Sequence, residues 1–132
     1  MNKTKAIIAA LVLAAVGALS GCGHSTFDVT GRLVLASENP GEWEEDESCS
    51  GSSGYDDIES GAQVIVYDNK DTKLATASLG EGVALTSMAC RFTFTVHDVP
   101  AQDADLYGIE VTSRGQITFS QEQADDVGMT LG

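Results

Sequence analysis

Apolar and polar residues alternate along most of the chain beyond residue 26. The segment "STFDVTGRLVL" places its large apolar side chains on one face and Asp, Thr and Arg on the other. In "CRFTFTVHDVP", Phe92, Phe94 and Val96 point one way, while Arg91 and the polar residues between them point the other way. A period of two with β-branched and aromatic residues is typical of half-buried strands.

The same pattern predicts seven strands, near 27–36, 62–68, 73–79, 91–97, 106–113, 116–120 and 127–131. Turn residues stand between them, as in "DNKD" at 68–71 and "SRG" at 113–115. A short helical turn is expected at 120–126, with Ser120 as its N-cap and Gln123 completing a capping box. Strands about ten residues apart favour an all-β fold, a single antiparallel β-sandwich over 27–132.

A different pattern precedes the strands. Lys3 and Lys5 form a positive head, and the run from Ala6 to Leu19 carries no charge. This run is shorter than the roughly 20 apolar residues of a membrane-spanning helix. It has the length of the apolar region of an export signal, so we expect a helical signal peptide over 1–21.

The residues Leu19-Ser20-Gly21-Cys22 resemble the lipobox of bacterial lipoproteins. In that family the cysteine sulfur receives a diacylglyceryl group and the chain is cut just before it. The resemblance implies lipidation of Cys22, a tether over 22–26, and attachment to the extracytoplasmic side of the cell membrane. The alternative is an ordinary exported protein with a stray cysteine near the cut. Two or three acyl chains anchor stably, whereas one holds marginally.

The cysteine count is odd, because the chain has three cysteines. If Cys22 carries lipid, Cys49 and Cys90 remain as a pair, and an oxidising compartment favours a disulfide between them. Two separately buried thiols are the alternative. Neither cysteine has another cysteine or a histidine two to five positions away, so a zinc site is not expected.

Acidic residues dominate the charge. The chain has 20 acidic and seven basic residues. Removal of residues 1–21 takes away Lys3 and Lys5, which leaves 111 residues with a net charge near −15. Such a surface repels nucleic acid and anionic lipid head groups. We therefore expect no nucleic-acid partner, and a folded monomer held at the membrane through lipid.

The run "TGRLVL", "SGAQVIVYDNKDTKLATASL" and "RFTFTVHDVPAQDADLYGIEV" resembles the prealbumin-like or carboxypeptidase-regulatory-like sandwich over about residues 28–112. The segments "GYDDIESGAQVIVYD" and "YGIEVTSRGQITFS" are also similar to small exported actinobacterial lipoproteins of no established activity. Neither resemblance carries catalytic residues across, and a sandwich hosts many functions.

A long acidic loop, residues 37–61, interrupts the strand pattern. Long ordered loops on a rigid scaffold often carry binding residues. Its candidate binding residues are Trp43, Glu44, Glu45, Asp46, Glu47, Asp56 and Asp57. Their carboxylates could hold Ca²⁺, but no EF-hand spacing is present, so a solvated acidic loop is expected and no cofactor. Trp43 either anchors a partner or folds back onto the sandwich.

Catalytic chemistry finds little support. His97 and Asp98 lie at the end of a predicted strand, where neighbouring residues point to opposite faces, so the two are not expected to form a relay. Asp103 with Asp105, or Asp125 with Asp126, could serve as general acid and base. We expect a non-catalytic binding module for an envelope protein, a cell-wall component or a cation. A small hydrolase with a carboxylate site and a purely structural envelope protein are the alternatives.

Overall fold

The computed structural model describes residues 25–132. The predicted signal peptide at 1–21 and the lipidation site at Cys22 lie outside these residues. The first strand begins at Thr26, and the carbonyl of Ser25 accepts a hydrogen bond from the Ala101 N–H at 2.9 Å. The described chain is therefore joined to the sandwich from its first residue.

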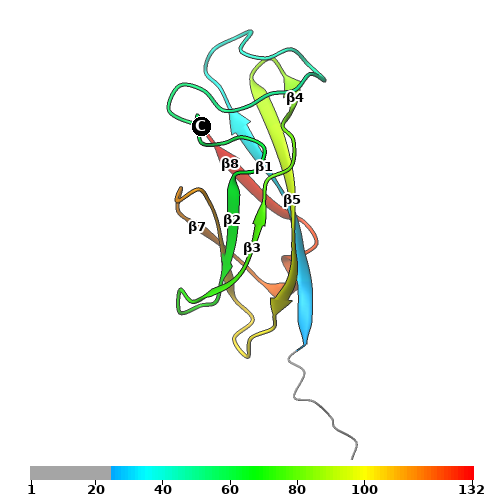
Figure 1. Cartoon of the computed structure of the whole chain (residues 1–132), viewed down its shortest axis with the longest axis vertical. Helices are drawn as coiled ribbons and strands as arrows, with labels where there is room; N and C mark the ends of the chain where they lie inside the picture. The colour runs from blue at the N-terminus through cyan, green and yellow to red at the C-terminus, as the bar shows by residue number, and fades with distance from the viewer. Residues whose placement is uncertain (1–24) are drawn as a thin grey trace, which may run out of the picture.

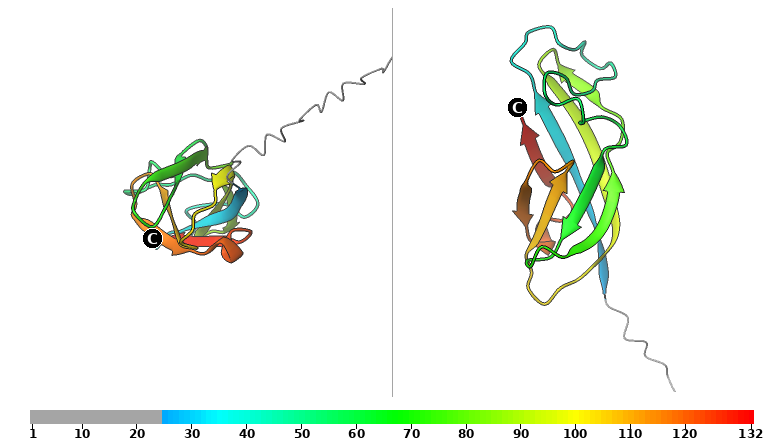
Figure 2. Two further views of the ribbon diagram at one scale, coloured as in Figure 1. Left: turned by 90° about the horizontal axis from the view of Figure 1, so that it is seen from below. Right: turned by 60° about the vertical axis from the view of Figure 1, so that its left-hand side comes forward.

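Two four-stranded sheets face each other across one core (Figure 1; Figure 2). Their strands are bounded as follows: β1 Thr26–Ala36, β2 Gln63–Tyr67, β3 Lys73–Ser78, β4 Val83–Thr86, β5 Ala89–Pro100, β6 Tyr107–Val111, β7 Gln116–Phe119 and β8 Val127–Leu131. One sheet has the order β4-β5-β1-β8 and the other β3-β2-β6-β7. The all-β prediction is confirmed, and each of the seven predicted strands is present.

The alternation of apolar and polar residues along the strands determines which side chains form the core. Successive side chains of a strand point to opposite faces, and Leu33, Phe92 and Val96 are all fully buried between the sheets. The outward positions of β5 from Arg91 to His97 are exposed. No polar or charged residue is buried within residues 25–132, so the described core is held by apolar contact.

Gly31 is the one inward position of β1 without a side chain. A Cβ there would lie 2.4 Å from the Val127 carbonyl oxygen and 2.5 Å from Cζ of Phe94. Because Gly31 has no side chain, the Phe94 ring occupies the space above it and β8 lies close to β1. Gly31 therefore allows β1 to pack closely against β5 and β8.

Two features correct the sequence predictions. The sandwich is not purely antiparallel, because β8 pairs with β1 in parallel. After β7 the chain crosses to the other sheet through the 3₁₀ turn η1, Gln121–Gln123, and then runs in the direction of β1 (Figure 2). The strand β4 was also missed, since its residues "VALT" begin with three successive apolar residues and do not alternate.

The predicted turn after β7 is present at η1. The Ser120 N–H donates to Oε1 of Gln123 at 2.9 Å, as expected from the capping sequence. The Gln123 N–H donates to the Ser120 carbonyl at the same distance. These bonds fix the crossing between the two sheets.

Candidate binding site at the loop end of the sandwich

The acidic loop 37–61 covers the end of the sandwich at which β1 ends, opposite the end at which β1 begins (Figure 1). Its middle runs along β4. The Asp46 N–H donates to the Ala84 carbonyl and the Ala84 N–H donates to the Glu47 carbonyl, both at 2.9 Å. The Cys49 N–H donates to the Gly82 carbonyl at 3.0 Å. The strand that the sequence did not reveal therefore pairs with the middle of the loop.

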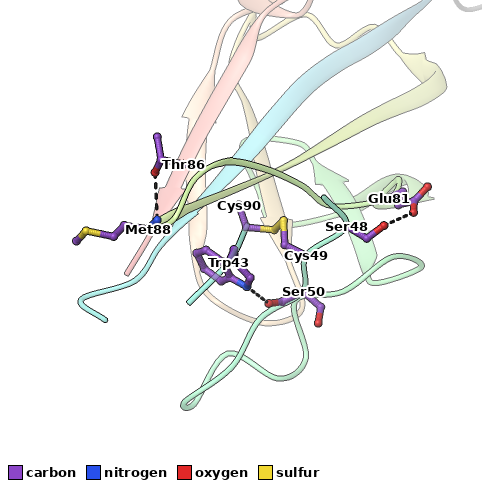
Figure 3. The surroundings of a disulfide bond; sticks show 8 residues. All are labelled: Trp43, Ser48, Cys49, Ser50, Glu81, Thr86, Met88 and Cys90. Carbon is purple, nitrogen blue, oxygen red and sulfur yellow. Dashed lines mark hydrogen bonds between the residues drawn. A yellow bond between two sulfur atoms is a disulfide. The ribbon is translucent and has the colours of Figure 1, made fainter. Parts of the chain in front are cut away.

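The predicted disulfide between Cys49 and Cys90 is present, with Cα atoms 6.0 Å apart (Figure 3). Cys90 is fully buried at the start of β5. The bond thus joins the loop covalently to a core strand, beside the Trp43 ring.

A polar clasp holds the later part of the loop against the opposite sheet. Asp57 accepts hydrogen bonds from Oγ1 of Thr112 at 2.6 Å and Nε of Arg114 at 3.1 Å. The Arg114 guanidinium also donates to the Gly54 carbonyl at 2.7 Å and lies over the Tyr55 ring, 4.7 Å from its centroid. The hydrogen bonds from Arg114 and then Thr112 lower the pKa of Asp57 to about 2.

The candidate acids of the loop are not gathered at one point. Glu44, Glu45, Asp46 and Glu47 are exposed, as is Asp56. Asp57 is already engaged by Arg114. Within residues 25–132, no group of three or more His, Cys, Asp or Glu side chains is placed to hold a metal ion.

Trp43 folds back onto the sandwich, which is one of its two predicted arrangements. Its indole is half-buried against the core, and Nε1 donates to the Ser50 carbonyl at 3.2 Å (Figure 3). Part of the ring still lines a surface hollow of about 260 Å³ between the loop and the end of β1. Tyr55 lines the same hollow. Sequence reasoning missed Tyr55, since only the fold brings it beside Trp43.

His97 has a carboxylate partner that sequence reasoning also missed. A bulge places His97 and Asp98 together opposite Asp28, so both are exposed rather than on opposite faces. Asp28 lies 3.0 Å from Nδ1 of His97 and accepts the Asp98 N–H at 3.0 Å. The bond from the Asp98 N–H and that to His97 lower the pKa of Asp28. Asp98 has a φ of 55°, which the bulge requires.

The acid pairs considered for catalysis make structural contacts. Asp105 accepts the Gln121 N–H at 3.0 Å, and Asp126 forms an ion pair with Arg32. Asp103 and Asp125 are exposed. Two of the four acids thus support the crossing at η1 and the outer face of β1.

No family model, curated protein or solved structure matches this chain. Among residues 25–132, no helix is long and apolar enough to cross a membrane.

Proposed function

We propose that this chain is a lipid-anchored, extracytoplasmic binding module of the cell envelope, non-catalytic and monomeric, with a prealbumin-like sandwich. Cys22 carries the lipid that holds it at the membrane. The acidic loop 37–61, with Trp43, supplies the binding surface for an envelope component.

The observation that supports this proposal is that the start of β1 and the acidic loop lie at opposite ends of the sandwich. In the sequence, Cys22 precedes the first described residue, Ser25, by three positions, and β1 then runs 11 residues to the loop end. At about 3.3 Å per residue, β1 spans roughly 33 Å. A protein held by its first mature residue would then present the loop away from the membrane surface.

The loop is also rigid enough to serve as a binding surface. One disulfide, the Asp57–Arg114 clasp and the pairing along β4 fix it to both sheets. Surfaces that are ordered before binding lose less entropy when a partner binds. The net charge near −15 favours uncharged or cationic partners over polyanions.

Two experiments test the proposal. Cys22→Ala should release the protein from membranes and abolish labelling by radioactive palmitate, whereas persistent labelling would contradict lipidation at Cys22. The full chain, purified in detergent, should sediment with isolated cell-envelope material of the source organism. Trp43→Ala should reduce this sedimentation, and Leu106→Ala, at an exposed residue near the opposite end, should not. Equal sedimentation of both variants would contradict binding through the loop.

A further inference from the structure

The surface hollow at the loop end has a lining unlike the rest of the acidic loop. Leu35 closes it on the side of the core, and Trp43 and Tyr55 supply two aromatic rings. Its polar side chains are mostly uncharged and include Asn39 and Ser53. Glu38 is the one acidic side chain of the lining within the described chain, and no Lys, Arg or His side chain contributes.

Both rings are held in place. The indole N–H of Trp43 donates to the Ser50 carbonyl at 3.2 Å, beside the disulfide (Figure 3). Tyr55 is covered by the Arg114 guanidinium. The backbone of Asn39 is held by its N–H, which donates to Oγ of Ser37 at 3.1 Å, and Asn39 is exposed. The hollow is therefore formed before any ligand binds.

We propose that this hollow binds an uncharged saccharide stacked on Trp43 and Tyr55, an inference that rests on the proposed binding function. One face of a sugar ring presents C–H groups, which suit the electron-rich face of an aromatic ring. The sugar's hydroxyl groups both donate and accept, as do the serine hydroxyls and the Asn39 amide. The lining offers no cation for an anionic ligand.

The size of the hollow limits the ligand. Its volume of about 260 Å³ lies just below the roughly 300–1,000 Å³ of sites for drug-sized ligands. One or two sugar rings would fill it, as a segment of a longer glycan. Aromatic-lined grooves also bind proline-rich peptides. The small volume and the hydroxyl-rich lining favour the sugar, and a peptide is one outcome of the test.

Trp43 is the single tryptophan of the chain and lines this hollow, so its fluorescence should respond to a ligand bound there. The full chain in detergent is titrated with tetra-N-acetylchitotetraose, cellotetraose, maltotetraose and mannotetraose, all uncharged and each up to about 10 mM, and with a polyproline peptide. A saturable change in Trp43 emission with at least one oligosaccharide is expected. Tyr55→Ala should weaken its affinity about tenfold or more, an aromatic contact of about 1.4 kcal/mol.

Asn39→Ala should weaken the same affinity about three- to tenfold, as expected for one hydrogen bond. Because Asn39 is exposed, this variant folds even if Tyr55→Ala does not. Leu106→Ala serves as the matched control and should leave affinity unchanged. Unchanged affinity in Asn39→Ala would overturn the site.

The possible failures are distinguishable. No change with any of the four oligosaccharides, or a saturable change with the peptide alone, would overturn the saccharide ligand. Sedimentation with envelope material would then still support the binding module. Saccharide binding without any sedimentation would instead contradict the envelope function and leave the site standing.

Discussion

The sandwich and the acidic loop 37–61 are stabilised in different ways. The sandwich buries an alternating set of apolar side chains from both sheets, with no buried polar residue in the described chain. The loop contributes one fully buried large apolar residue, Ile58. It is otherwise fixed by a disulfide, a salt bridge and main-chain bonds to β4. One region depends on burial and the other on specific linkages.

Because the two regions are stabilised differently, they can have different roles. Apolar burial is spread over many residues, so the sandwich forms a stable support. The loop can expose aromatic and acidic side chains because its linkages, and not those side chains, keep it in place. A rigid scaffold with a separately tethered loop is a common arrangement for binding sites.

The largest expected effect is on the sandwich. Phe94→Ala removes a ring that is 4% exposed and leaves a cavity, so the free energy of unfolding should fall by about 3–5 kcal/mol. Chemical denaturation of the variant and the wild type measures this difference in the free energy of unfolding. Thr93→Ala, on the outward face of the same strand, is the control and should change stability by less than about 0.5 kcal/mol. A neutral result for Phe94→Ala would mean that the inward face of β5 is misassigned.

Loss of the disulfide should affect the loop more than the sandwich. Its closed loop of about 42 residues predicts roughly 4 kcal/mol in the chain-entropy model, and native disulfides typically contribute about 2–4 kcal/mol. In Cys49→Ala/Cys90→Ala, hydrogen exchange should rise more across 37–61 than in β2 and β6, whose amides open only with global unfolding. In the native protein, both cysteines should resist alkylation until reduced. Uniformly faster exchange in all strands would contradict a separate tether.

A smaller effect is expected where β1 and β8 meet. In Gly31→Ala the new methyl group would press on the Val127 carbonyl and the Phe94 ring. Overpacking of this kind costs about 1–3 kcal/mol. Gly128→Ala, whose Cβ would meet only an Arg32 nitrogen at 3.9 Å, is the control. Equal thermal stability of the two variants would contradict the close pairing of these strands.

The smallest effect concerns the clasp. The pKa of Asp57 is about 2 in the fold, below its ordinary 3.8. Its contribution to stability is therefore fully present above about pH 4 and is lost as the pH falls through about 2. Asp57→Asn should flatten the fall in stability over this range, by an amount limited by solvent screening. Asp56→Asn, at its exposed neighbour, should keep the wild-type slope. Identical slopes in all three proteins would argue against the clasp.

The sequence predicted those parts that periodicity or simple counting can reveal. Alternation located seven strands and the inward faces of β1, β5 and β6, and the odd cysteine count led to the Cys49–Cys90 bond. It missed β4, whose residues "VALT" do not alternate, and the parallel pairing of β8, which depends on the crossing after β7. The bulge at Asp98 was not predicted, because one extra residue shifts the alternation of inward and outward side chains.

The candidate site was only partly predictable for a related reason. Trp43 and the loop stood out by composition, whereas Tyr55 joins the hollow only through the fold of the loop. Arg114 and Asp57 are 57 residues apart, and no local sequence pattern predicts their contact. Contacts that are distant in sequence and polar in character leave no periodic signal.

The central claim, that the protein is attached at one end and presents the acidic loop at the other, can be tested by energy transfer from tryptophan to a dansyl-labelled lipid. The lipidated full chain is reconstituted in vesicles, with Trp43 as donor at the loop end. A second protein, Trp43→Phe/Leu106→Trp, places the donor near the opposite end. The account predicts clearly stronger transfer from position 106 than from position 43, and loss of both signals in Cys22→Ala. Equal transfer, or stronger transfer from position 43, would contradict it.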